Sequence, residues 1–228
     1  MFKARKKITR REIQKDPFLE GLYSIKMFFS NNKQKIIQLS IGIVLGVIVV
    51  TYIYNKKLTQ NQAAETALGK ALVSLTKGDK DDGRLKLELL VDDFSGSKPA
   101  QKGLFLLGKN YYEIEDYLTA KSYLNEFIED PSDEFHASAL TLLAEIEKNN
   151  SNIESAAEYY QRAISASTTN FQKIQTQLNL AKFYLEIGKY KESKLLLDSI
   201  LKHGDVDKNV QNKIDEITGR LSQVNSDE

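Results

Sequence analysis

Histidines and paired acidic residues are the side chains of this chain that could do acid–base or metal chemistry. The 228-residue sequence has two histidines, His136 and His203, and no cysteine. An acid–base or metal site needs several such groups together, and neither histidine has an evident partner in the sequence. The acidic pairs fall at expected turns and helix ends, where capping and solvation explain them: Asp81-Asp82, Asp92-Asp93 and Asp133-Glu134. With no glycine-rich phosphate loop and no metal-ligand spacing either, the sequence predicts a protein that is not an enzyme and takes no cofactor or metal.

An uncharged apolar run near the N-terminus gives the clearest prediction of a helix in this sequence. Between Lys35 and Asn55 stand nineteen residues, of which twelve are Ile, Val or Leu. As a helix this run is about 28 Å long, close to the roughly 30 Å hydrocarbon core of a bilayer. It is longer than the apolar region of a signal peptide and has no small-residue cleavage site. The run therefore predicts a transmembrane helix over residues 36–54, in place of a core helix or a cleaved signal peptide.

The distribution of basic residues predicts the orientation of this helix. Residues 1–35 carry ten Lys and Arg against three acidic residues, whereas the twenty residues after the run carry three Lys. Within twenty residues on each side the basic counts are equal, so the prediction depends on the whole tail. The positive-inside rule then places the N-terminus in the cytoplasm and the larger domain outside it.

Three shorter patterns belong to the same region. Thr9 to Glu12 matches a capping box, and Asp16-Pro17 is a second helix start, followed by apolar residues at helical spacing. They predict a short amphipathic helix on the inner leaflet, although a docking segment for a partner fits as well. Gly42 and Gly46 form a G-x-x-x-G pattern, which allows close helix packing and a possible homo-oligomer.

The remainder of the chain is acidic. Residues 58–228 hold 20 Lys and Arg against 28 Asp and Glu, a net charge of −8. Nucleic-acid binding needs a cationic surface, so this composition argues against a nucleic-acid partner. Because no Gly or Pro stands between Asn55 and Gln62, we expect the membrane helix to run on into the first soluble helix.

Three units of 36–37 residues begin at Gln101, Ala137 and Ile174, each predicted as two helices joined by a turn. Small residues recur where the two helices of a unit would cross: Gly108 with Ala120, Ala144 with Ala156 and Ala181 with Ser193. A helix pair of this kind cannot bury its apolar face alone, so the pairs are expected to stack. Val210, Ile214, Ile217 and Leu221 then predict one closing helix.

These units resemble tetratricopeptide repeats, which carry Leu-Gly-x-x-Tyr in the first helix and Ala-x-x-x-Phe-x-x-Ala in the second. Leu107, Gly108, Tyr111, Ala120 and Leu124 give the best match, whereas the tryptophan of the family is absent. The matching residues cover about 100–200, and residues 58–98 form a half-matching pair. The predicted fold is all-α: a single N-terminal transmembrane helix, then a tetratricopeptide-like solenoid of about four helix pairs with a C-terminal capping helix.

The resemblance implies a concave groove lined by the first helix of each pair. By repeat position the candidate protein-binding residues are Lys102, Phe105, Lys109, Tyr112 and Glu113, then Ser138, Thr141, Glu145 and Lys148, then Leu178, Lys182 and Leu185. Phe105 and Tyr112 are aromatic at i and i+7, as peptide anchors would be, but core packing explains them equally well.

The full order of elements divides the chain into five expected parts. These are a basic cytoplasmic tail with a short helix (1–35), the transmembrane helix (36–54), a linking helix and first helix pair (55–98), three helix pairs (99–203), and the capping helix and tail (204–228).

This layout resembles the bacterial YfgM-like family, ancillary subunits of the SecYEG translocon. The resemblance implies a non-enzymatic adaptor or chaperone-like protein, with translocon subunits, secretory clients and periplasmic chaperones as partners. The alternatives are a scaffold subunit of another envelope assembly, and an enzyme or regulator that works through the basic tail.

Overall fold

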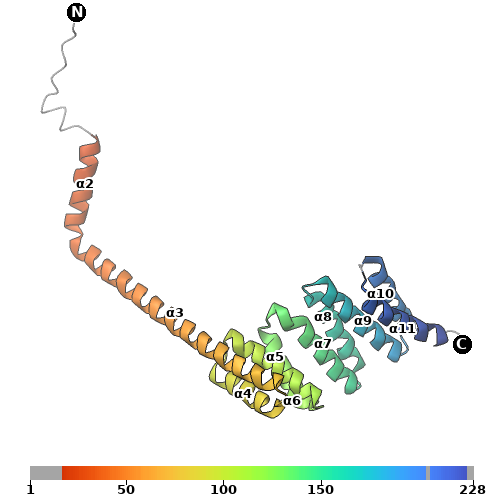
Figure 1. Cartoon of the computed structure of the whole chain (residues 1–228). Coiled ribbons are helices and arrows are strands. Elements are labelled where there is room, and N and C mark those ends of the chain that lie inside the picture. Colours follow the sequence, from red (N-terminus) through yellow and green to blue (C-terminus); the bar gives the residue numbers. More distant parts are fainter. Residues whose placement is uncertain (1–16, 204–205, 225–228) are drawn as a thin grey trace, which may run out of the picture. The chain divides into compact units, whose positions relative to one another are not determined.

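The computed structural model describes residues 17–203 and 206–224, which form helices joined by short turns and contain no strand (Figure 1). The predicted capping box at Thr9–Glu12 and the expected helix cap Asp16 lie outside the described residues. The described helices are α2 (Pro17–Asn31), α3 (Lys33–Thr76), α4 (Lys80–Asp93), α5 (Lys98–Glu113), α6 (Tyr117–Glu129), α7 (Asp133–Asn149), α8 (Ile153–Ala166), α9 (Asn170–Glu186), α10 (Tyr190–His203) and α11 (Lys208–Val224). The all-α fold predicted from the sequence is confirmed.

The chain divides into two compact units, with the border between Leu58 and Thr59. The first unit holds α2 and the N-terminal part of α3. Among the described helices, α3 is the one whose length and composition would allow it to cross a bilayer, and none of its apolar window is buried. α3 is a single helix from Lys33 to Thr76, as the lack of Gly and Pro after Asn55 predicts.

The second unit is a stack of antiparallel helix pairs. The end of α3 pairs with α4, α5 with α6, α7 with α8, and α9 with α10, and α11 packs on the last pair (Figure 1). Four apolar clusters run along the stack. Each cluster joins one pair to the next helix; for example, Ala120 and Leu124 of α6 share a cluster with Leu143 of α7. Because every pair completes its core on its neighbour, the unit is a solenoid.

The turn inside each helix pair has the same backbone geometry. Gly78, Glu115, Ser151 and Gly188 have φ of 87°, 63°, 59° and 78°, in the left-handed region. At the residue after each of them, an N–H donates back to a carbonyl five residues earlier, as in Asp116 to Tyr111 and Lys189 to Tyr184. This is the Schellman ending of a helix. The first pair, which matches the repeat pattern only in part, therefore shares the turn of the other three.

Small residues stand where the helices of a pair cross, as predicted. A Cβ built on Gly108 would lie 2.5 Å from Leu124 Cγ and 3.3 Å from the Ala120 carbonyl oxygen. In the last pair, the Ser193 hydroxyl donates a 2.7 Å hydrogen bond to the Ala181 carbonyl. The predicted closing helix is α11, whose apolar residues share a buried cluster with α9 and α10: Val210, Ile214, Ile217 and Leu221.

Candidate protein-binding groove

An open cavity of about 320 Å³ lies along the first helices of three successive pairs, α5, α7 and α9. It is lined by Phe105, Lys109, Ser138, Thr141, Leu142, Gln172, Gln175, Thr176 and Asn179. Ser138 and Thr141 share one face of α7, and the four α9 residues follow the helical spacing i, i+3, i+4 and i+7. We call this surface, with Lys182 one turn beyond Asn179, the groove.

The sequence placed Phe105, Lys109, Ser138 and Thr141 on this surface, and the structure brings these four together. The prediction for α9 was wrong in part. Leu178 and Leu185 are buried in the cluster shared with α11, because the closing helix packs on that side of α9. The residues that line the groove in their place are Gln172, Gln175, Thr176 and Asn179, whose polar stripe was the signal available in the sequence.

Hydroxyl and amide groups give the groove neutral hydrogen-bonding capacity. The hydroxyls of Thr141 and Thr176 donate to the carbonyls of Ala137 and Gln172 one turn earlier, which leaves their lone pairs available to a ligand. The Gln175 side-chain oxygen accepts a 2.9 Å hydrogen bond from Lys213 of α11. Side chains of this kind can satisfy both the N–H and the C=O groups of an extended backbone.

The candidate binding residues do not share one environment. Phe105 is only 6% exposed, and its ring stacks on Phe135 with centroids 4.6 Å apart. Lys102 lies 3.4 Å from the Glu134 carboxylate and 5.9 Å from the centre of the Phe135 ring. Both residues therefore take part in joining α5 to α7.

Lys109 and Lys182, by contrast, are exposed. Among the described residues, neither lysine forms an ion pair or a side-chain hydrogen bond. Their ammonium groups are therefore available to a carboxylate of a ligand.

Tyr112 stands beside a charged network at one end of the groove. Its ring packs on Tyr117, with centroids 5.6 Å apart. The Lys148 ammonium lies 2.6 Å from Glu145 and 3.7 Å from Glu186, and the Tyr160 hydroxyl donates to Glu145. Burial raises the pKa of Tyr112, and the charge of Glu145 raises it further.

Burial lowers the pKa of Lys148, but the negative charges of Glu145 and Glu186 outweigh this effect, so the pKa of Lys148 is raised overall. Lys148 therefore stays charged and holds the two carboxylates together.

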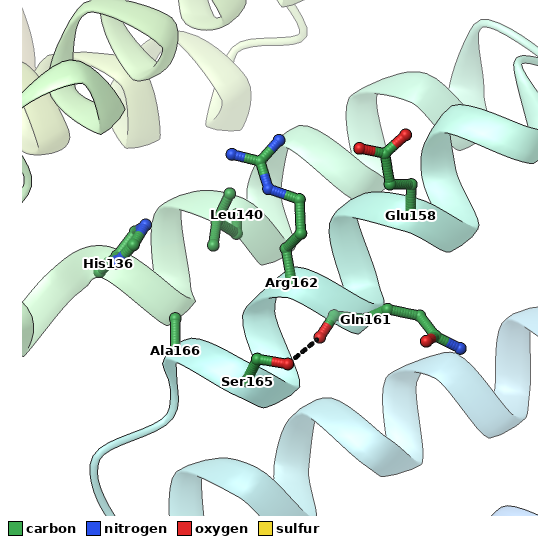
Figure 2. Close-up of a pocket in the computed structure, with 7 residues that line it drawn as sticks. All are labelled: His136, Leu140, Glu158, Gln161, Arg162, Ser165 and Ala166. Carbon is green, nitrogen blue, oxygen red and sulfur yellow. Dashed lines mark hydrogen bonds between the residues drawn. The ribbon is translucent and has the colours of Figure 1, made fainter.

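A second open cavity, of about 470 Å³, lies between α7 and α8 (Figure 2). His136 and Leu140 line it from α7, and Glu158, Gln161, Arg162, Ser165 and Ala166 line it from α8. Burial lowers the pKa of His136, and the positive charge of Arg162 lowers it further, so the imidazole is neutral at pH 7. The hydrogen bond drawn in Figure 2 joins the Ser165 hydroxyl to the Gln161 backbone carbonyl. It activates no nucleophile, since the hydroxyl only donates to a neighbouring turn.

Two further observations concern the remaining candidate sites. Within the described ranges, no three His, Asp or Glu side chains converge as a metal site would require. Gly42 and Gly46 lie in the apolar part of α3, and apart from the adjoining helix backbone no described atom stands within 4 Å of a Cβ built on either. Both glycines are therefore open to a neighbouring helix.

Comparison with known proteins gives the following matches. A family model described as a tetratricopeptide repeat-like domain matches residues 26–159, more than half of the chain. No curated protein matches the sequence. A tetratricopeptide repeat protein from Parabacteroides merdae is similar in structure, with a TM-score of 0.56 at 14% identity, over 69% of this chain and 61% of that one. A putative kinesin light chain from Podosopora anserina gives 0.57 at 14% identity, over 72% and 89%. At these identities the similarity shows the fold alone.

Proposed function

Because this chain belongs to the family of tetratricopeptide repeat-like domains, we propose that its groove binds an extended segment of a partner protein. Repeats of this fold present an elongated surface built from the first helix of each pair, and that surface suits a chain without secondary structure of its own. The groove spans three such helices and combines one aromatic ring with neutral amides and hydroxyls.

The observation that carries the proposal is that, within the described ranges, the lysines in the groove are unpaired, unlike the candidate lysines outside it. Lys102 and Lys148 are held in ion pairs, but Lys109 and Lys182 are exposed and, in the described residues, unpaired. An exposed ammonium beside a line of amides would attract a carboxylate while the amides bond the backbone next to it. We therefore expect a segment with at least one acidic side chain.

The wider role that we propose is that of a non-enzymatic adaptor or chaperone-like protein in the bacterial inner membrane. Residues 36–54 would anchor it, the basic tail would stay in the cytoplasm, and the repeats would act in the periplasm. Support comes from the order of these elements, which resembles the YfgM-like family. On this basis the partners would be translocon subunits beside α3, and secretory clients or periplasmic chaperones in the groove.

Site-specific photocrosslinking in living cells tests both parts of the proposal. A photoreactive residue at Ser138, Asn179 or Tyr112 samples the groove while keeping both lysines, and one at Val49 samples the face of α3 that carries Gly42 and Gly46. Leu118 on α6, 84% exposed, is the matched control outside the groove. We expect secretory proteins or chaperones from the groove sites and translocon subunits from Val49, identified by mass spectrometry.

The charge-reversal variants Lys109→Glu and Lys182→Glu should reduce the groove crosslinks obtained from Tyr112. If the groove sites crosslink no more than Leu118 does, the proposed binding surface is wrong. A single stoichiometric envelope protein captured from every site would instead support the scaffold alternative.

A further inference from the structure

α2 carries an apolar face that none of the described residues of its unit covers. Its apolar residues Phe18, Leu22, Ile25 and Phe29 follow the spacing i, i+4, i+7 and i+11 and share one side of the helix. Their side chains are 72%, 48%, 56% and 55% exposed. Glu20, Ser24 and Asn31 lie on the opposite side, and no side chain from 18 to 31 is buried.

The short link to α3 places α2 next to the apolar run. Asn32 alone separates the two helices, and it is bonded to both: its N–H donates to the Phe28 carbonyl at 3.0 Å, and its carbonyl accepts from the Ile36 N–H at 2.9 Å. The uncharged run therefore begins a single turn after α2 ends. Wherever that run enters a bilayer, the C-terminal end of α2 lies at the same surface.

The composition and length of α2 suit the surface of a bilayer better than its interior. Fifteen helical residues span about 22 Å, less than the roughly 30 Å hydrocarbon core, and Glu20 and Lys26 are charged. Phe28, beside the main stripe, is also more than half exposed, whereas Met27 lies on the same side as Glu20 and Ser24. Aromatic side chains favour the boundary between headgroups and acyl chains, and lysines favour the headgroups.

We propose that α2 lies in the plane of the membrane interface, with its apolar face against the acyl chains of the leaflet at which residues 36–54 begin. The proposal rests on the membrane anchoring proposed above. A lipid surface is the occupant that the position of α2 favours, since only Asn32 separates it from the helix that carries the apolar run. α2 would then be a second contact with the bilayer, at the surface, beside the spanning contact of α3.

Single-tryptophan fluorescence can locate α2, because the chain contains no tryptophan. The full chain would be reconstituted in phosphatidylcholine–phosphatidylglycerol vesicles with bromine at shallow or deep acyl positions. Phe29→Trp probes the apolar face of α2, Ser24→Trp the polar face, and Val47→Trp the middle of the spanning segment. We expect Phe29→Trp to be quenched most by shallow bromine, Ser24→Trp by acrylamide in the water, and Val47→Trp by deep bromine.

A second substitution, Ile25→Glu, sharpens the experiment. It places a charge in the apolar face and should move Phe29→Trp into acrylamide reach while Val47→Trp stays deep. If Phe29→Trp and Ser24→Trp are equally open to acrylamide while Val47→Trp is deep, α2 is in water and the inference fails although the anchor stands.

The remaining outcomes are equally distinct. If Val47→Trp is also open to acrylamide, the proposed anchoring itself fails. If Phe29→Trp is protected from acrylamide but no brominated lipid quenches it, a protein covers the face, and the inference is again overturned. Deep quenching at both Phe29 and Ser24 would mean that α2 inserts into the bilayer core, which also contradicts a position at the surface.

Discussion

Glu147 shows how one buried charge connects three elements of the repeat unit. Its carboxylate is 3% exposed, lies 2.5 Å from Lys121 on α6, and accepts a 2.6 Å hydrogen bond from the Asn152 side chain before α8. The Lys121 contact holds the pKa of Glu147 below its usual 4.5 although burial opposes this, and Asn152 lowers it further. A pKa that is lower in the folded state means that the ionised form stabilises the fold.

We predict that this stabilisation is full above the unfolded-state pKa and is lost as the pH falls through the lower, folded-state pKa of Glu147. Urea unfolding of the full chain in detergent between pH 7 and pH 3 measures it. Glu147→Gln should flatten the pH dependence in this range. Lys121→Met leaves the carboxylate without its cation and should cost about 1–3 kcal/mol at pH 7, less than for a fully buried pair because Lys121 is 37% exposed. An unchanged pH slope in Glu147→Gln would contradict the assignment.

Phe105 and Lys109 stand one turn apart on the groove but should respond differently to substitution. Phe105→Ala removes a ring that packs on Phe127 and Phe135, so we expect a loss of about 3–5 kcal/mol in unfolding free energy. Lys109→Glu changes an exposed, unpaired charge, so it should leave stability within about 0.5 kcal/mol and lower the affinity for an acidic peptide. Urea melts together with peptide titrations separate the two effects. If Phe105→Ala is neutral in stability, its role as a core residue is wrong.

At the scale of the elements, the left-handed turn inside each helix pair predicts opposite changes in stability for two substitutions. Ser151 and Gly188 occupy the same turn position with φ of 59° and 78°, but only glycine adopts this region without steric cost. Ser151→Gly should therefore stabilise the unit by about 0.5–1 kcal/mol, and Gly188→Ala should destabilise it by about 1 kcal/mol. Thermal unfolding of both variants measures the difference, and changes of the same sign in both would contradict the shared geometry.

The crossing of α5 and α6 gives the second prediction at this scale. Gly108→Ala would place a methyl group 2.5 Å from Leu124 Cγ in a closed core, which outweighs the gain in helix propensity. We expect a net loss of about 1–2 kcal/mol in the free energy of unfolding by urea. Gly219→Ala is the matched control, because no atom stands within 4 Å of its built Cβ and the change should stabilise α11 by up to about 1 kcal/mol. A stable Gly108→Ala variant would mean that the helices can separate at this crossing.

The helix pairs could be predicted from the sequence more completely than the residues that line the groove. Leu107, Gly108 and Ala120 pack against residues at a sequence spacing that is the same in every repeat. This spacing is visible in the sequence, so the helix pairs could be predicted. The groove face of α9 depends on which side α11 covers, and this contact joins residues such as Leu178 and Ile214 that no local pattern relates. Leu178 therefore matched a groove position by repeat count while its side chain belongs to the core.

For the whole molecule, the orientation across the membrane is the prediction with the widest consequences. Ten Lys and Arg precede the apolar run and three follow within twenty residues, so the positive-inside rule predicts a cytoplasmic N-terminus. The chain has no cysteine, so single cysteines can report on each side: Ser30→Cys before the run, and Asp198→Cys, exposed on α10. A membrane-impermeant maleimide applied to spheroplasts should label Asp198→Cys directly and Ser30→Cys only after lysis. The reverse pattern would place the groove in the cytoplasm, where it could not meet periplasmic partners, and would favour a regulator over the proposed adaptor.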